Sequence, residues 1–334
     1  MACASPFFIH SGMVTLLLST LTSLFTIVEL NCENLFDCRH DTQKNDMEFL
    51  PDGPRHWTRT RYWRHLNRTA QTILACGEDN NEWRLPDLVA LTEVENDSVL
   101  FDLTRRSLLR NAAYDYVMTN SPDERGIDVA LLYSPFSFRL LNHHSIHIEP
   151  LKGMRPTRDV LYVSGRILSG DTLHVYLVHA PSRSQGEGIT RPYRRHVASR
   201  VLASVDSLRR ISPSAKIVVC GDFNDYSDDE SLRQYAEQGL ADVSAHATGS
   251  HGAKGTYRYQ GQWGSLDHIL LSPSLQERVA GCCIFDAPFL LVPDERNGGV
   301  QPFRNYLGLR YQDGFSDHLP LVLRLSLFAK PDDA

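Results

Sequence analysis

The chain has 334 residues, of which 42% are hydrophobic, so it is long enough to bury a large core. Its net charge of −6 excludes a global positive field that would hold polyanions non-specifically, so any phosphate recognition must be local. The seven cysteines form no CxxC or Cys/His zinc spacing, which argues against a structural zinc site and a disulfide framework.

The N-terminal segment, residues 1–23, contains an uncharged apolar stretch that is similar to the core of an export signal. No Lys or Arg precedes this stretch, no clear small-residue cleavage site follows it, and it is rich in Thr and Ser. We interpret it as a poor export signal rather than a membrane anchor. We therefore expect no stable membrane insertion, and we favour a secreted or periplasmic location over a cytoplasmic one.

In the first half of the chain, LFTIVEL at 24–30 predicts a strand, and NCENLFD after it predicts a loop. Residues 58–76 place apolar side chains at helical spacing and predict an amphipathic helix. A strand at 85–94 is followed by a helix with Asn96 or Asp97 as its N-cap. Two more strands are expected at 114–118 and 126–133.

In the second half, strands are expected near 160–168 and 173–179, and Pro192 is expected to open a helix. Further strands are predicted at 217–223, 266–272 and 320–327. Several of these runs are apolar throughout, which is typical of strands that are covered on both faces. The pattern favours an α/β (α+β) fold in which mixed sheets pack together with helices outside. We assign residues 24–329 to one domain and residues 330–334 to a tail.

Polar side chains stand at the ends of these apolar strands. Glu93 follows LVALT and is our first choice of ligand for a hard cation such as Mg²⁺. In GDFND, Gly221 allows a close backbone approach, Asp222 can orient or deprotonate a water, and Asn224 can donate its amide to a phosphate oxygen. Each motif taken alone is common in solvated loops, so the prediction depends on their combination.

Aspartate precedes histidine in both LDH and SDH, near the end of the chain. We expect His318 to couple with Asp267 across strands and to stabilise charge on a phosphate, which leaves Asp317 near the metal and His268 in a structural role. His179 ends another strand, and Arg183 after it can bind the same phosphate group. Arg195 lies in a cluster of arginines that we also expect to bind substrate.

These motifs closely resemble those of the endonuclease/exonuclease/phosphatase superfamily, over residues 25–327, and NCENLFD, RGIDVALLY and HAPSR are most similar to a bacterial endonuclease-like subgroup. The resemblance implies a four-layer sandwich of two packed, mostly antiparallel or mixed β-sheets flanked by helices. It implies site residues at the following positions: Asn31, Glu33, Glu93, His179, Asp222, Asn224, Asp267, Asp317 and His318. Ala180 and His268 depart from the residues that relatives tend to carry.

The sequence thus predicts a Mg²⁺- or Mn²⁺-dependent phosphodiesterase that acts on nucleic acid, as a nuclease cutting DNA or RNA. Glu93, Asn31, Glu33 and Asp317 are the expected metal-binding residues, and we favour a monomer. An inositol or lipid phosphatase or a sphingomyelinase-like enzyme is the alternative, for which Trp57 and Trp63 form the only candidate membrane-contacting cluster. A catalytically inactive binding module is a third hypothesis, and the complete set of site residues argues against it.

Overall fold

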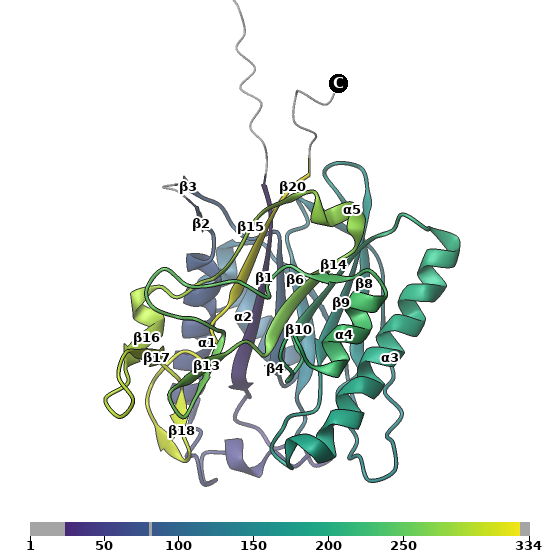
Figure 1. Ribbon diagram of the computed structural model, residues 1–334. Helices are drawn as coiled ribbons and strands as arrows, with labels where there is room; N and C mark the ends of the chain where they lie inside the picture. The colour runs from purple at the N-terminus through teal and green to yellow at the C-terminus, as the bar shows by residue number, and fades with distance from the viewer. Residues whose placement is uncertain (1–23, 80–81, 328–334) are drawn as a thin grey trace, which may run out of the picture.

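The computed structural model describes residues 24–79 and 82–327, and two six-stranded sheets dominate it (Figure 1). In the first sheet, β1 and β4 run parallel and the remaining neighbours are antiparallel. Its strands, in spatial order, are β15 (Val279–Ile284), β20 (Leu321–Ser326), β1 (Leu24–Leu35), β4 (Leu88–Val94), β6 (Asp128–Tyr133) and β5 (Asp115–Met118).

The second sheet has the same kind of mixed topology, with β9 and β10 parallel and the other neighbours antiparallel. Its strands, in spatial order, are β11 (Ala241–Asp242), β14 (Asp267–Leu271), β10 (Lys216–Asp222), β9 (Thr172–His179), β8 (Val160–Ile167) and β7 (Phe138–Ile146).

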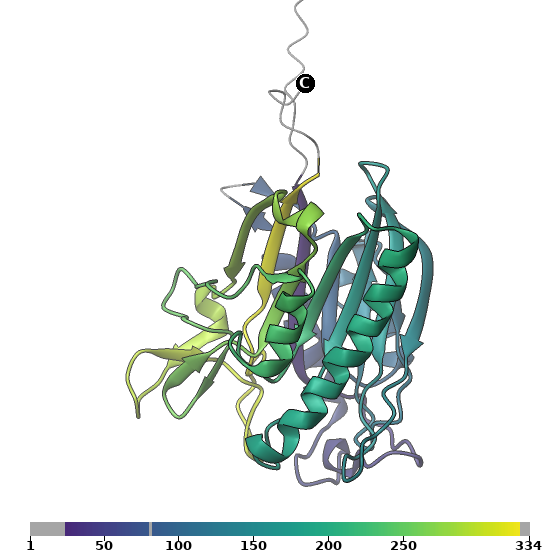
Figure 2. The ribbon, with the colours of Figure 1, turned by 45° about the vertical axis from the view of Figure 1, so that its right-hand side comes forward.

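Helices cover the outer face of each sheet. Helices α1 (Arg59–Ala75) and α2 (Asp97–Arg105) pack on the first sheet, and α3 (Glu187–Ile211) and α4 (Glu230–Glu237) pack on the second. Figure 2 shows α3 and α4 in front of the strands of the second sheet. The N-cap side chains of Thr58 and Asn96 accept backbone N–H groups in the first turns of α1 and α2, which explains where these helices begin.

A large apolar core fills the space between the two sheets. It contains side chains from both inner faces, such as Ile27 and Leu323 from the first sheet and Val175 and Ile269 from the second. One further core lies between the first sheet and its helices, and another lies between the second sheet and its helices. The layers are therefore helix, sheet, sheet and helix, which confirms the predicted four-layer sandwich.

Short elements complete the fold. Four two-stranded hairpins are β2 (Glu78–Asp79) with β3 (Glu82–Trp83), β12 (Tyr257–Tyr259) with β13 (Gln262–Gly264), β16 (Leu291–Pro293) with β17 (Val300–Pro302), and β18 (Tyr306–Leu307) with β19 (Arg310–Tyr311). The short helices are α5 (Pro273–Gln276), η1 (Met47–Phe49), η2 (Leu108–Asn111) and η3 (Pro288–Leu290).

Two predicted boundaries are wrong. The segment NCENL continues β1 instead of forming a loop, because a bulge at Glu33 and Asn34, with φ of 49° and 61°, lets the strand regain its pairing at Leu35. Helix α3 begins at Glu187, so Pro192 lies inside the helix rather than at its start.

The segments expected at the chain ends, residues 1–23 and 330–334, lie outside the described residues. Among the residues that the structure does describe, no helix is both long and apolar enough to span a membrane.

Candidate active site

Strand order brings the polar strand ends to one edge of the sandwich. In the first sheet, Asn31 and Glu93 lie near the ends of the parallel strands β1 and β4. In the second sheet, His179 and Asp222 end the parallel strands β9 and β10 and face each other in register. The antiparallel strand β14 begins at this same edge, where Asp267 pairs with Asp222.

Gly221 makes the close approach of β9 and β10 possible. Its φ of 135° is accessible to glycine, and a Cβ at this position would lie 1.9 Å from the carbonyl oxygen of Val178. A larger residue here would push the strand ends apart. The glycine of the GDFND motif therefore sets the spacing between His179 and Asp222.

The Asp222 carboxylate is held from both sides. Its Oδ2 accepts a hydrogen bond from Asn31 Nδ2 at 3.1 Å, and its Oδ1 accepts the backbone N–H of Asn224 at 2.8 Å. Burial, together with the nearby charge of Asp267, raises the pKa of Asp222 to about 7. A carboxylate that is oriented in this way and titrates near neutrality is suited to accept a proton from water.

His318 and Asp267 form a buried pair beside Asp222. The distance from His318 Nδ1 to Asp267 Oδ2 is 2.7 Å. Burial alone would lower the pKa of His318, but the Asp267 carboxylate outweighs it and raises this pKa well above its ordinary value. The ring packs against Tyr257 with a centroid distance of 4.9 Å. His318 is therefore a fixed cationic donor at neutral pH, coupled to Asp267 as the sequence predicts.

Glu93 and His179 complete the cluster on its other side. Glu93 Oε2 accepts the backbone N–H of Asn34 at 2.9 Å, and its Oε1 lies 3.9 Å from His179 Nε2. The same His179 nitrogen lies 3.7 Å from Asp222 Oδ2. Burial, followed by the charges of Arg158 and Arg125, lowers the pKa of His179 well below its ordinary value. His179 is thus a neutral imidazole between two carboxylates.

A search of the curated proteins finds no match to this sequence. The model of the Endonuclease/Exonuclease/phosphatase family matches residues 26–327. The chain belongs to this family. It is therefore a hydrolase of phosphoester bonds, and the family membership confirms the resemblance seen in the motifs.

Several solved structures of the endonuclease/exonuclease/phosphatase family share the fold. A mannosyl-6-phosphatase from Bacteroides thetaiotaomicron superposes with a TM-score of 0.58 at 17% identity, covering 90% of this chain and 98% of its own. The catalytic domain of human Nocturnin gives a TM-score of 0.55 at 16% identity, with 90% and 93% coverage. Truncated TDP2 from Caenorhabditis elegans gives 0.55 at 16% identity, with 92% and 98% coverage. At these identities the likeness establishes the fold alone.

Enzymes of this family generally depend on a divalent metal ion, and the buried donors here fit one. Ligand atoms of Asp222, Asp267 and His318 lie within 4.8 Å of one another, and Asp267 Oδ1 is buried without a hydrogen-bond partner among the described residues. His318 is the poorest ligand of the three, because its ring is cationic and bound to Asp267. The Glu93 carboxylate lies beside this group and suits a hard cation, whereas Asn31 turns its Nδ2 toward Asp222 and its Oδ1 accepts the backbone N–H of Glu33 at 2.9 Å.

One of the predicted metal-binding residues, Glu33, is engaged outside the cluster. The Glu33 carboxylate accepts the backbone N–H groups of Asn305 and Tyr306, at 2.6 and 2.8 Å, so it fastens the β18 loop to β1. Asp317 is half-buried, and its charge helps to raise the pKa of Glu33, after burial, and that of His318, after Asp267 and Asp222, so its role as a metal ligand stays a prediction. The positive φ of Glu33, which strand periodicity does not anticipate, turns its carboxylate toward this loop.

The two predicted substrate-binding arginines are engaged with carboxylates. Arg183 Nη2 lies 2.5 Å from Asp229 and 3.2 Å from Asp225, and its Nε donates to the carbonyl of Asn224. Arg195 lies on α3, where it pairs with Glu230 at 3.0 Å. These contacts tie Arg183 to the GDFND loop and Arg195 to α4, and a role of either arginine in substrate binding stays a prediction.

His268 occupies the structural position that strand alternation predicts. Its Nδ1 lies 2.8 Å from Asp242, and its Nε2 lies 2.9 Å from the carbonyl oxygen of Asp225. The side chain is fully buried and faces away from the Asp222 cluster, because neighbouring residues of β14 alternate in direction.

Sequence reasoning assigned no role to Glu29, which is fully buried on β1 two residues before Asn31. Neither of its carboxyl oxygens has a hydrogen-bond partner among the described residues. Burial, with Asp267 and Asp222 nearby, raises its pKa well above the ordinary value, so the folded protein holds Glu29 in its protonated form. The sequence contained a signal for this role, because Glu29 lies in an apolar strand two residues before Asn31 and therefore on the same face of the sheet.

Glu29 should make folding stability depend on pH. Because its folded pKa is raised, its contribution is fully present below the unfolded value and is lost as pH rises toward the folded value. Relative to Glu29→Gln, the wild type should lose about 1.4 kcal/mol per pH unit in this interval. Urea unfolding of both proteins with chelator present, at several pH values from 5 to 8, checks this. Parallel stability profiles would contradict the assignment.

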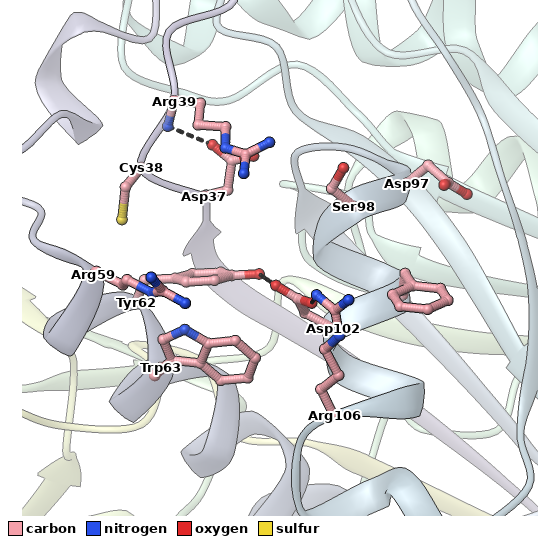
Figure 3. A pocket seen from close by; sticks show the side chains of 11 residues that line it. Asp37, Cys38, Arg39, Arg59, Tyr62, Trp63, Asp97, Ser98, Asp102 and Arg106 are labelled. Atoms are coloured by element: carbon pink, nitrogen blue, oxygen red, sulfur yellow. Dashed lines mark hydrogen bonds and ion pairs between the residues drawn. The ribbon is translucent and has the colours of Figure 1, made fainter.

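A cavity of about 440 Å³ lies away from the catalytic cluster, between the start of α1 and helix α2 (Figure 3). Polar side chains in its wall bond to one another: Asp102 accepts hydrogen bonds from Tyr62 and Arg106. Burial and then the charges of Asp37 and Glu95 raise the pKa of Cys38 to about 11, and three aspartates and three arginines balance each other in the lining. None of the site residues predicted above lines this cavity.

Proposed function

We propose that this chain is a divalent-metal-dependent phosphodiesterase, specifically a nuclease that hydrolyses DNA or RNA. The observation that carries the proposal is the meeting of an oriented Asp222 carboxylate, with a pKa of about 7, and the cationic His318–Asp267 pair at one buried edge. A proton acceptor and a fixed cation side by side suit the in-line displacement of an alkoxide from phosphate by water.

The proposed roles follow from these contacts. Asp222 accepts a proton from the attacking water, while Asn31 and the backbone of Asn224 hold the carboxylate in place. His318 donates to a phosphate oxygen as negative charge develops, with Asp267 fixing the ring orientation. His179 and the Asn224 side chain supply neutral donors. Bound at Glu93 and Asn31, Mg²⁺ or Mn²⁺ would supply positive charge for the phosphate and the departing oxygen.

A diester suits this site better than a monoester does. Besides the protonated Glu29, three buried or half-buried carboxyl groups surround it: Glu93, Asp222 and Asp267. A phosphodiester carries one negative charge at neutral pH, so these groups repel it less than they repel a dianionic monoester. Nucleic acid is the phosphodiester that the bacterial endonuclease-like motifs favour.

A phosphatase or a sphingomyelinase-like enzyme is the second candidate, since a mannosyl-6-phosphatase shares the fold. The expected membrane-contacting pair weakens the lipid version. Trp57 is fully buried and donates to the carbonyl of Phe36, so it cannot contact a bilayer, and Trp63 is half-buried. Trp57 and Trp63 therefore do not form a paired membrane anchor.

Incubation of the purified protein with Mg²⁺ or Mn²⁺ and a substrate panel tests the proposal. The panel contains plasmid DNA, RNA, bis(p-nitrophenyl) phosphate, a sugar phosphate, inositol phosphates and sphingomyelin. We expect cleavage of DNA or RNA and of the simple diester, abolished by a chelator and restored by excess metal. Hydrolysis confined to sphingomyelin, inositol phosphates or the sugar phosphate would replace the nuclease proposal.

A further inference from the structure

A small cavity of about 160 Å³ adjoins the catalytic cluster on the side of His179. Three loops line it: residues 123–125 before β6, residues 154–158 before β8, and residues 181–185 after β9. Tyr193 of α3 closes its far side. No role in the proposed hydrolysis has been assigned to these loops.

The cavity and the catalytic cluster share a wall. Arg158 Nη2 donates to the carbonyl oxygen of Ala180 at 2.7 Å, and the catalytic Asn224 donates to the same oxygen at 3.2 Å. Arg125, at the cavity rim, donates to Asn34 at 2.8 Å and lies 3.5 Å from Glu93. A ligand in the cavity is therefore separated from the Asp222 cluster by little more than one residue.

The electrostatics of the cavity favour an anion. Three arginines line it, against two carboxylates, Asp123 and Glu124. Only Asp123 is closely paired, at 3.2 Å from Arg158, whereas the largely exposed Arg155 and Glu124 are 3.9 Å apart. The lowered pKa of His179 reports the same positive potential, because Arg158 and Arg125 contribute to it after burial.

Two residues that line the cavity carry buried polar atoms that the protein leaves unpaired. Thr157 is buried, and its Oγ1 has no partner among the described residues, as is also true of Arg158 Nε. A buried donor that is left unpaired costs free energy, so such groups are expected to meet a ligand or an ordered water. Ser182 and Ser184 also line the cavity, and their hydroxyl groups bond to each other at 2.8 Å.

We propose that this cavity is a subsite for a second phosphate group of the substrate, next to the phosphate that is cleaved. The inference rests on the proposed phosphodiesterase function and narrows its substrate to a strand with consecutive phosphates, that is, an oligonucleotide. Charge-assisted hydrogen bonds from arginine and threonine then hold the neighbouring phosphate and fix the register of the strand.

Kinetics with matched substrates test the subsite. The trinucleotide TpTpT carries a neighbouring phosphate, whereas bis(p-nitrophenyl) phosphate has only the scissile one. We expect Thr157→Val and Arg155→Ala each to raise KM for TpTpT about tenfold, the loss of one charge-assisted hydrogen bond, with kcat little changed. KM for bis(p-nitrophenyl) phosphate should stay within twofold of the wild type, and Arg166→Ala, an exposed arginine farther along β8, serves as the control.

The outcomes separate the subsite from the chemistry. Unchanged KM for TpTpT in both variants, or an equal rise for both substrates, would overturn the subsite while leaving hydrolysis itself intact. A KM effect confined to an inositol phosphate with two phosphates would overturn the assignment to nucleic acid. If the wild type fails to hydrolyse bis(p-nitrophenyl) phosphate with Mn²⁺, the proposed function itself fails, and the subsite that depends on it falls too.

Discussion

Replacing Asp222 by asparagine should lower kcat for diester hydrolysis by about 10²–10⁴-fold, because a general base contributes rate enhancement of this order. The amide cannot accept the proton of the attacking water. It also turns a donor toward Asn31 Nδ2 or the N–H of Asn224, where the carboxylate accepts from both. The protein should stay folded, since the change removes a buried carboxylate that Asp267 repels.

A control substitution at another aspartate and a pH profile show whether the loss of activity comes from the Asp222 carboxylate itself. Asp206→Asn makes the same chemical change on α3 and should leave kcat unaltered. In the wild type, kcat/KM should fall as the pH drops below about 7, because protonation removes the Asp222 base. Near-normal turnover by folded Asp222→Asn, or an unchanged acid limb in that variant, would remove Asp222 from the mechanism.

The fold was largely predictable because its strands carry strong local signals. The run IVVCG is apolar throughout, and the strand that it forms, β10, is buried on both faces. The hydrophobic pattern of the sequence therefore matches the burial of the strand. The edge strand β7 escaped prediction, because its sequence FRLLNHHSI is mostly exposed and lacks alternation. Helix α4 and strand β15 were missed for a similar reason, since each is short and depends on tertiary packing.

The convergence of the site was predictable from strand ends, and alternation gave the direction of His268, whereas the direction of Glu33 was not predictable. Parallel pairing of β1 with β4 and of β9 with β10 brings Asn31, Glu93, His179 and Asp222 to one edge, as their positions after apolar runs indicated. The positive φ of Glu33 sends its carboxylate to the β18 loop instead. The cavity beside His179 depends on three separate loops, and no local motif encodes such a shape.

The His318–Asp267 pair should behave as one unit in catalysis. His318→Gln should lower kcat by about 10²–10³-fold, as expected for the loss of a preorganised donor to the developing charge. Asp267→Asn should weaken the same donor, because its carboxylate keeps the ring cationic and oriented. The double variant should therefore be little worse than His318→Gln alone. In the wild type, activity should fall at high pH as His318 loses its proton. This alkaline limb of the pH profile should be absent in His318→Gln.

The half-buried His174, which bonds to Tyr162 near the middle of the second sheet, provides the control, since His174→Gln removes an imidazole without touching the cluster. It should keep the kcat and the alkaline limb of the wild type. Fully additive losses in the double variant would mean that His318 and Asp267 act separately. Asp267 would then contribute through a route other than the imidazolium, and the charge that builds on phosphate would have to be met mainly by the groups around Glu93.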